Sequence, residues 1–200
     1  MPAAIEFYFD FSSPYGYLAA QRIDAIAARH DRAVAWKPFL LGAIFKTTGA
    51  KPLLEIPLKG SYAARDLQRS ARQLGVPFRL PEPFPFAAVA ASRAFYWAWD
   101  EDNADARELA KALYHAAFGE GRSIAGAEEV AGIAAGLGYQ RHEVAAVLAD
   151  PRIKDRLREE VAGAEAKGVF GSPYILVDGE PFWGHDRLHE VELWLAQGGW

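Results

Sequence analysis

The chain has 200 residues, enough to bury a sizeable core in one large domain or in a domain with an insertion. Its 22 basic and 26 acidic residues give a net charge of -4, which excludes a basic face with nucleic acid as the main partner. The absence of cysteine excludes a disulfide framework, a cysteine-ligated metal and a cysteine nucleophile.

The N-terminal segment predicts a β-α-β unit. Residues 5–9 are a short apolar run rich in strand-forming side chains, and a helix is predicted from Pro14 to about Ala28. Ser13 is a favourable N-cap for this helix, and Pro14 is a favourable first helical residue. Residues 33–39 are predicted to form the second strand, and the connection of two strands through a helix favours their parallel pairing.

The middle of the chain predicts one long irregular segment followed by a helical block. Residues 42–60 hold glycines and prolines at short intervals, and loops of this length are usually functional or disordered. Because the segment also holds Lys46, Lys51 and Lys59, we interpret it as a binding loop. Helices are predicted at 61–74 with Ser61 as cap, and then at 86–99, 104–118, 126–137, 140–148 and from Asp150 onward.

The C-terminal segment returns to strands. Residues 174–177 and 180–183 flank Asp178-Gly179, which is a strong hairpin signal, and a final helix is predicted over 186–195. The order of a β-α-β unit, a helical block and a β-β-α unit predicts an α/β domain. In this division, residues 1–60 and 169–200 form one unit and the helices of 61–168 are inserted into it.

Two motifs near the ends of the chain carry a family resemblance. Residues 10–18 read Asp-Phe-Ser-Ser-Pro-Tyr-Gly-Tyr-Leu, and residues 168–174 read Gly-Val-Phe-Gly-Ser-Pro-Tyr. Both resemble the DsbA-like thioredoxin superfamily. Within it, the chain is most similar to 2-hydroxychromene-2-carboxylate isomerases and the related kappa-class glutathione transferases, and residues 118–124 and 182–188 also match. The resemblance implies an α/β, thioredoxin-like fold with a large all-helical insertion.

The first motif places Ser13 and Gly16 where a thioredoxin-type redox protein carries the two cysteines of Cys-Pro-x-Cys. Any thiol must therefore come from outside the chain, and the resemblance implies that glutathione supplies it. From the residues alone, Ser13 is a structural N-cap, and a hydroxyl donor at a helix N-terminus also favours a thiolate over a thiol. In the family the equivalent serine hydrogen-bonds the sulfur of glutathione, so the resemblance implies that Ser13 is catalytic.

The second motif centres on Ser172 and Pro173. By itself, Pro173 fits a proline that begins a strand at a sheet edge. The resemblance implies a cis peptide bond after Ser172, which turns the backbone of that residue toward a peptide ligand. We therefore expect Ser172 and Pro173 to contact glutathione, with Ser172 contributing backbone groups.

Three charged residues complete the glutathione site that the resemblance implies. Asp186 and Arg187 match a pair that lies at the γ-glutamyl end of glutathione in the family, although Asp186 also fits a simple helix cap. Lys59 matches a lysine that meets a glutathione carboxylate in kappa-class enzymes, and a solvated loop lysine explains it equally well. The family pattern departs at Ala50, where kappa-class enzymes have asparagine, so no asparagine contact carries over.

Other classes of site and location receive little support from the sequence. The five histidines show no metal-ligand spacing, so we expect no metal. No stretch approaches the roughly 18 consecutive apolar residues of a membrane span. Residues 1–4 lead directly into the first strand, so we expect no export signal and a cytoplasmic location. We also expect a homodimer without nucleic-acid or membrane partners.

The resemblance implies a glutathione-dependent isomerase that acts on an aromatic hydroxychromene carboxylate or benzylidenepyruvate by reversible thiolate addition. The residues themselves support thiol-peptide binding beside an aromatic pocket. Two alternatives therefore stay open. A kappa-like glutathione transferase would use the same thiolate but release a conjugate. A redox-dead, thioredoxin-like peptide-binding module would need no activated thiol.

Overall fold

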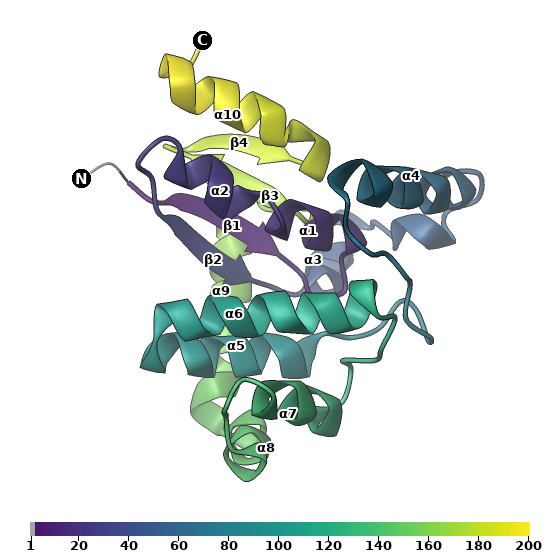
Figure 1. Cartoon of the computed structure of the whole chain (residues 1–200), viewed down its shortest axis with the longest axis vertical. Coiled ribbons are helices and arrows are strands. Elements are labelled where there is room, and N and C mark those ends of the chain that lie inside the picture. Colours follow the sequence, from purple (N-terminus) through teal and green to yellow (C-terminus); the bar gives the residue numbers. More distant parts are fainter. Residues whose placement is uncertain (1–2) are drawn as a thin grey trace.

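The computed structural model describes residues 3–200 and contains a mixed sheet in the order β2-β1-β3-β4 (Figure 1). The strands are β1 (Ile5–Phe9), β2 (Val34–Pro38), β3 (Tyr174–Val177) and β4 (Glu180–Trp183). β1 pairs parallel with β2 and antiparallel with β3, and β3 and β4 form an antiparallel hairpin. All four predicted strands are confirmed, as is the parallel β-α-β pair.

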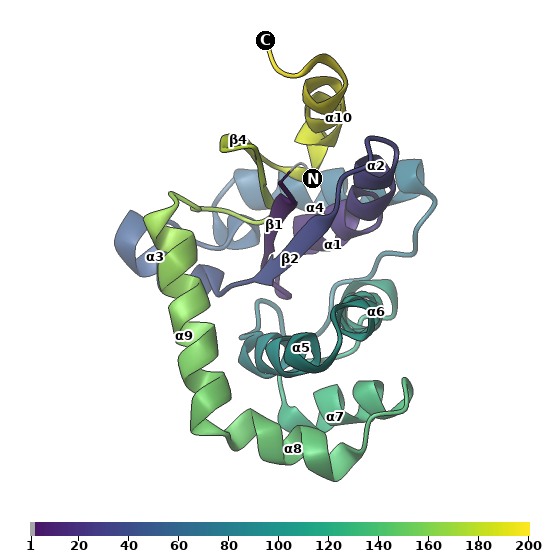
Figure 2. The same ribbon diagram turned by 90° about the vertical axis from the view of Figure 1, so that its left-hand side faces the viewer.

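Alternation of side chains along β1 builds a core on each face of the sheet. Phe7 and Phe9 pack with Trp36 of β2 in the larger core, which takes in α1 (Pro14–Ala20), α2 (Ile23–Ala28) and α10 (Leu188–Gln197). Tyr8 belongs to a smaller core with α3 (Leu41–Thr48) and the C-terminal end of α9 (Pro151–Ala166). Figure 2 shows α1 and α2 on one side of the sheet and α3 with α9 on the other.

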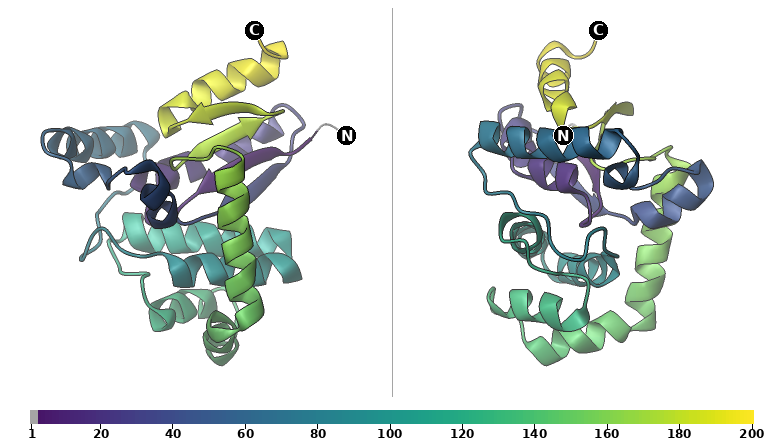
Figure 3. Two further views of the ribbon diagram at one scale, coloured as in Figure 1. Left: turned by 180° about the vertical axis from the view of Figure 1, so that it is seen from behind. Right: turned by 90° about the vertical axis from the view of Figure 1, so that its right-hand side faces the viewer.

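A helical block occupies the part of the chain between β2 and β3. Figures 1 and 2 show α5 and α6 side by side below the sheet, with α7 and α8 beneath them. The long helix α9 runs from this lower layer up to the sheet (Figure 3). Besides α9, the helices between α3 and β3 are α4 (Lys59–Leu74), α5 (Val89–Glu101), α6 (Asn103–Tyr114), α7 (Ala127–Ala135) and α8 (Arg141–Ala149).

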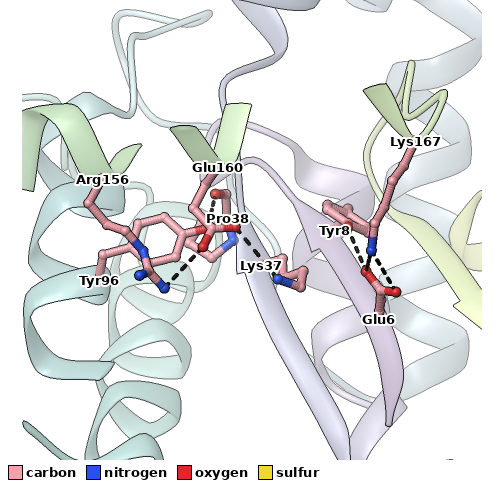
Figure 4. A network of polar contacts seen from close by, with 8 residues as sticks. All are labelled: Glu6, Tyr8, Lys37, Pro38, Tyr96, Arg156, Glu160 and Lys167. Atoms are coloured by element: carbon pink, nitrogen blue, oxygen red, sulfur yellow. Dashed lines mark hydrogen bonds and ion pairs between the residues drawn. The ribbon is translucent and has the colours of Figure 1, made fainter. Parts of the chain in front are cut away.

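A polar network ties α9 to the sheet and to α5 (Figure 4). Glu160 lies 3.5 Å from the Lys37 ammonium and 3.0 Å from the Arg156 guanidinium, and the Arg156 guanidinium lies over the ring of Tyr96. The Tyr96 hydroxyl donates to the Pro38 carbonyl oxygen (2.6 Å). These contacts join the helical block to the C-terminal end of β2, which pairs with the C-terminal end of β1.

Three predicted elements differ from the structure. The helix predicted over 14–28 is two helices, α1 and α2, which are interrupted at Gln21 and Arg22. The segment 42–60 is not irregular throughout, because it contains most of α3 and a short helical turn, η1 (Leu53–Glu55). Ser61 does not cap α4, which begins at Lys59; its hydroxyl donates to the Leu58 carbonyl oxygen (2.9 Å).

The remaining helices are confirmed with changes at their ends. The predicted helix at 104–118 corresponds to α6 followed by a π-helical turn, η2 (His115–Gly119). The final helix begins at Leu188 after a 3-10 turn, η3 (His185–Arg187), so Asp186 does not cap it. The division at 60/61 and 168/169 stays a prediction. Within residues 3–200, no helix has both the length and the apolar character that crossing a membrane requires.

Candidate functional site

The turn between β1 and α1 forms the centre of the candidate site. Ser13 caps α1 as predicted, since its hydroxyl oxygen accepts a hydrogen bond from the Gly16 N–H (3.0 Å). Pro14 is the first helical residue. Position 16 requires glycine, because a Cβ there would collide with the Tyr114 hydroxyl. The sequence Ser-Pro-Tyr-Gly thus places a capped helix N-terminus against a buried tyrosine.

Asp10 lies beneath this turn and organises it. Its side chain is 3% exposed, and its carboxylate accepts hydrogen bonds from the Ser12 N–H (2.7 Å), the Ser12 hydroxyl (2.8 Å) and the Leu41 N–H (2.7 Å). Burial raises the pKa of the Asp10 carboxyl, while the donors from Ser12 and Leu41 act in the opposite direction. Asp10 therefore fixes the β1-α1 turn against the first turn of α3.

The Ser172-Pro173 segment faces the same turn, and its peptide bond is cis as predicted. The Ser13 hydroxyl donates to the Ser172 carbonyl oxygen (2.9 Å), and the Asp10 N–H donates to the Ser172 hydroxyl oxygen (2.9 Å). Within residues 3–200, no acceptor meets the N–H of Tyr15 or the N–H of Ser172. The turn and the cis-proline segment that faces it therefore each carry a backbone N–H without a partner among residues 3–200.

Tyr15 connects the turn to the C-terminal part of the site. Its ring stacks on His185 of η3, with a centroid distance of 4.9 Å and an interplanar angle of 22°. Its hydroxyl donates to Asp66 of α4 (3.0 Å). Burial raises the pKa of the Tyr15 hydroxyl, and the hydrogen bond to Asp66 raises it further, so Tyr15 is a neutral donor. The stack places η3, which carries Asp186 and Arg187, directly beside α1.

Lys59 lines a pocket that also includes Tyr15. The pocket has a volume of about 380 Å³ and is lined by Tyr15, Leu53, Leu58, Lys59, Tyr62 and Ala63. Lys59 is exposed, and among residues 3–200 no carboxylate forms an ion pair with it. Its ammonium is therefore open to an anionic ligand.

The structure groups the predicted site residues unequally. Ser13, Ser172 and Pro173 form one bonded cluster. Asp186 and Arg187 are exposed on η3, and the Arg187 guanidinium donates to Glu190 of α10. Lys59 lines a pocket with Tyr15, whose ring stacks on His185 of η3. The glutathione-binding roles of these residues stay predictions, but all six are arranged around the N-terminus of α1.

Three residues that shape the site lie outside the set of predicted site residues. Asp10 was part of the first motif, and a carboxylate at the end of an apolar strand is the signal that marks it. The stack of His185 on Tyr15 and the hydrogen bond from Tyr114 to the Asp10 carbonyl oxygen (2.8 Å) join residues far apart in the chain. No local pattern announces such contacts.

Comparison with known proteins identifies the family of the chain. Residues 4–196 match the DSBA-like thioredoxin domain family. A 2-hydroxychromene-2-carboxylate isomerase of Sphingobium xenophagum is 30% identical over 197 residues, which cover 98% of this chain and 99% of that protein. The chain belongs to the 2-hydroxychromene-2-carboxylate isomerase family of DsbA-like thioredoxin domains.

Other relatives place this isomerase family beside the kappa-class glutathione transferases. Glutathione S-transferase kappa 2 of Caenorhabditis elegans is 28% identical over 206 residues, covering 96% of this chain and 92% of that protein. A solved 2-hydroxychromene-2-carboxylate isomerase structure superimposes with a TM-score of 0.88 at 26% identity, covering 97% of this chain and 95% of that one. The predicted thioredoxin-like fold with a helical insertion is confirmed, and the relatives of this chain are isomerases and transferases.

Proposed function

We propose that the protein is a glutathione-dependent cis-trans isomerase that acts on an aromatic, conjugated α-keto acid such as a benzylidenepyruvate or a hydroxychromene carboxylate. The observation that carries the proposal is the cysteine-free turn, in which the Ser13 hydroxyl and the unpaired Tyr15 N–H lie at a helix N-terminus. These groups stabilise negative charge, so the turn is suited to an external thiolate.

The donors and acceptors of the site fit glutathione. An extended peptide needs a backbone donor beside the active turn, and the Ser172 N–H offers one. A peptide carboxylate needs a cation, and the Lys59 ammonium is open to it. The γ-glutamyl end carries an ammonium and a carboxylate, which match Asp186 and Arg187 on η3. No residue of the chain competes as a thiol, because the chain has no cysteine.

When bound, glutathione would supply a thiolate that adds reversibly to the activated double bond, permits rotation about the resulting single bond, and is then expelled. Ser13 would turn its hydroxyl proton from the Ser172 carbonyl toward the sulfur. The Tyr15 N–H would add a fixed dipole at the same position. Tyr15 would stay neutral at physiological pH, since burial and Asp66 raise the pKa of a hydroxyl that is already un-ionised at that pH. Asp10 would hold the turn in place through Ser12.

Product analysis tests this proposal against its alternatives. The protein is incubated with glutathione and either benzylidenepyruvate or a chlorodinitrobenzene, and the products are identified by chromatography. Interconversion of the cis and trans isomers with glutathione unconsumed supports the isomerase. A stable conjugate with either compound favours the kappa-like transferase. No reaction and no glutathione binding favour the redox-dead peptide-binding module. The cytoplasmic location and the homodimer stay predictions.

A further inference from the structure

An exposed leucine occupies a strained turn at the edge of the candidate site. Leu58 has φ 67° and ψ -49°, and the Lys59 N–H donates to the Pro57 carbonyl oxygen two residues back (2.8 Å). This is the γ-turn with positive φ, a rare and strained conformation for any residue with a side chain. The Leu58 side chain is 90% exposed, so burial in the core does not offset the strain.

The contacts around Leu58 enforce the turn. The Gly60 N–H donates to the Ile56 carbonyl oxygen (2.8 Å), and the Ser61 hydroxyl donates to the Leu58 carbonyl oxygen. Gly60 itself is packed so closely on the Leu54 carbonyl group that a Cβ there would collide with it. The chain therefore holds this conformation firmly, and its visible result is one apolar side chain kept in solvent.

Leu58 does not stand alone on this surface. It lines the pocket beside Tyr15 together with Leu53 and Tyr62, which are 40% and 64% exposed. The Arg69 guanidinium lies 5.8 Å from the centroid of the Tyr62 ring and restricts that ring. The volume of about 380 Å³ is in the range of small-molecule sites, so the pocket is large enough for one aromatic ring.

We propose that Leu58, Leu53 and Tyr62 form the seat for the aromatic ring of the electrophilic substrate, and that the strain at Leu58 is retained for this contact. The inference rests on the proposed function, because Tyr15 places the seat next to the turn that holds the thiolate. Aliphatic and phenol side chains offer an apolar surface with little hydrogen bonding, which selects an aryl group over a polar substituent. Strain maintained beside a binding site is the pattern expected of a functional turn.

Two variants of Leu58 separate the side chain from the strain. Leu58→Ala removes most of the apolar contact but keeps a Cβ at positive φ, whereas Leu58→Gly removes both. Asp31→Gly is the matched control, since Asp31 also has a positive φ (53°) and is exposed in the turn before β2. The electrophiles, whose cis-trans isomerisation is followed, are benzylidenepyruvate and 2-oxo-3-pentenoate, which share the reacting enone and the carboxylate and differ in a phenyl or methyl substituent.

We expect both Leu58 variants to lower kcat/KM for the phenyl enone by about ten-fold and to leave that for the methyl enone nearly unchanged. Without glutathione, Leu58→Gly should raise the midpoint of thermal unfolding by about 2 °C, because glycine adopts positive φ freely. Asp31→Gly should show a similar rise and full activity with both enones.

If the Leu58 variants affect the two enones equally, or leave the rate with the phenyl enone unchanged, Leu58 does not contact the ring. The proposed function is not affected by that result. A fall in the unfolding midpoint of Leu58→Gly overturns the claim that strain is stored there. Wild-type protein that reacts with neither enone in the presence of glutathione overturns the proposed function, and the substrate role of Leu58 falls with it. Glutathione binding, followed by thiolate absorbance, identifies that last case independently of the Leu58 variants.

Discussion

The Ser13 hydroxyl serves two partners in the ligand-free protein. It accepts from the Gly16 N–H and donates to the Ser172 carbonyl oxygen, so it joins the helix N-terminus to the cis-proline segment. Only the donated proton can be redirected to a thiolate, because the accepting lone pair already caps α1. A helix cap and a thiolate donor are therefore compatible roles of one side chain.

Replacement of Ser13 separates these roles, because the expected losses of turnover and of stability differ in magnitude. Ser13→Ala should lower turnover by about ten-fold or more, because the hydroxyl donor to the thiolate is lost. Its free energy of unfolding should fall by roughly 1 kcal/mol, the usual effect of losing a cap. Steady-state kinetics and chemical denaturation measure the two effects on the same preparation.

Asp102→Ala provides the matched control for Ser13→Ala. Asp102 caps α6 with its carboxylate, far along the chain from the site, and accepts from the Ala104 N–H (2.6 Å). It should lose stability to a similar degree and keep full turnover. If Ser13→Ala lost activity only in proportion to its folded fraction, Ser13 would be a cap and nothing more.

We expect His185 to make the stability of the folded protein depend on pH. Burial lowers the pKa of the imidazole below 6.5 and the charge of Arg22 adds to this, although Asp186 and Asp66 act upward. The folded protein therefore binds this proton less readily than the unfolded chain does. The stability that depends on neutral His185 is complete above about pH 6.5 and is lost as the pH falls through the lower, folded-state pKa.

His185→Phe tests this expectation, because phenylalanine keeps a ring beside Tyr15 and does not titrate. The free energy of unfolding of the wild type, relative to the variant, should decrease between about pH 7 and about pH 5. Denaturant titrations of both proteins at several pH values measure the difference. A difference that stays constant over this range contradicts the lowered pKa.

At the scale of elements, α1 is held by a tyrosine from the helical block. The Tyr114 hydroxyl donates to the Asp10 carbonyl oxygen and sits against Gly16, which has no Cβ to displace it. Tyr114 is fully buried at the end of α6, where the helix passes into the π-helical turn η2. The helical block thus supports the active turn through one hydrogen bond and one close approach.

Gly16→Ala should destabilise the protein by about 1 to 3 kcal/mol, because the new Cβ collides with the Tyr114 hydroxyl. In a Tyr114→Phe background the clashing oxygen is gone, so the same substitution should be much less damaging. Denaturation of the wild type, the two single variants and the double variant gives the coupling energy. Additive effects of the two substitutions would show that the collision does not occur.

Element prediction succeeded where the signals are local. The strands, the hairpin at Asp178-Gly179 and the Ser13 cap follow from short patterns. The break at Gln21 and Arg22 carries no glycine or proline, so nothing local marks it. The helix α3 was missed because Gly42 and Gly49 are typical of loops. In the structure, the first N–H of this helix donates to the carboxylate of Asp10, which lies 31 residues earlier.

At the scale of the whole molecule, the site is assembled from four separate parts of the chain. The parts that meet around the N-terminus of α1 are the β1-α1 turn, α4, the segment before β3, and η3. Two polar contacts hold the helical block to the sheet that carries these parts (Figure 4): Glu160 of α9 with Lys37, and Lys167, the residue that follows α9, with Glu6.

The candidate site was only partly predictable for the same reason. Motif matches indicated the residues that the resemblance places around glutathione, but Tyr15, which contacts both α4 and η3, gave no signal beyond its place in the motif. Likewise, the positive φ of Leu58 cannot be read from its sequence neighbours, Pro57 and Lys59. Long-range packing decides both features, and a single sequence does not display it.

The ionisation of glutathione bound to the protein tests the borrowed thiolate most directly. Thiolate absorbance in the ultraviolet is followed against pH for glutathione alone, with the wild type and with Ser13→Ala. With the wild type, the bound thiol should titrate below the value of about 8.5 typical of a free cysteine thiol, each unit of pKa corresponding to about 1.4 kcal/mol in favour of the thiolate. Ser13→Ala should return part of that shift. A bound thiol that titrates like free glutathione, or an absence of binding, would contradict the mechanism and leave a redox-dead peptide-binding module.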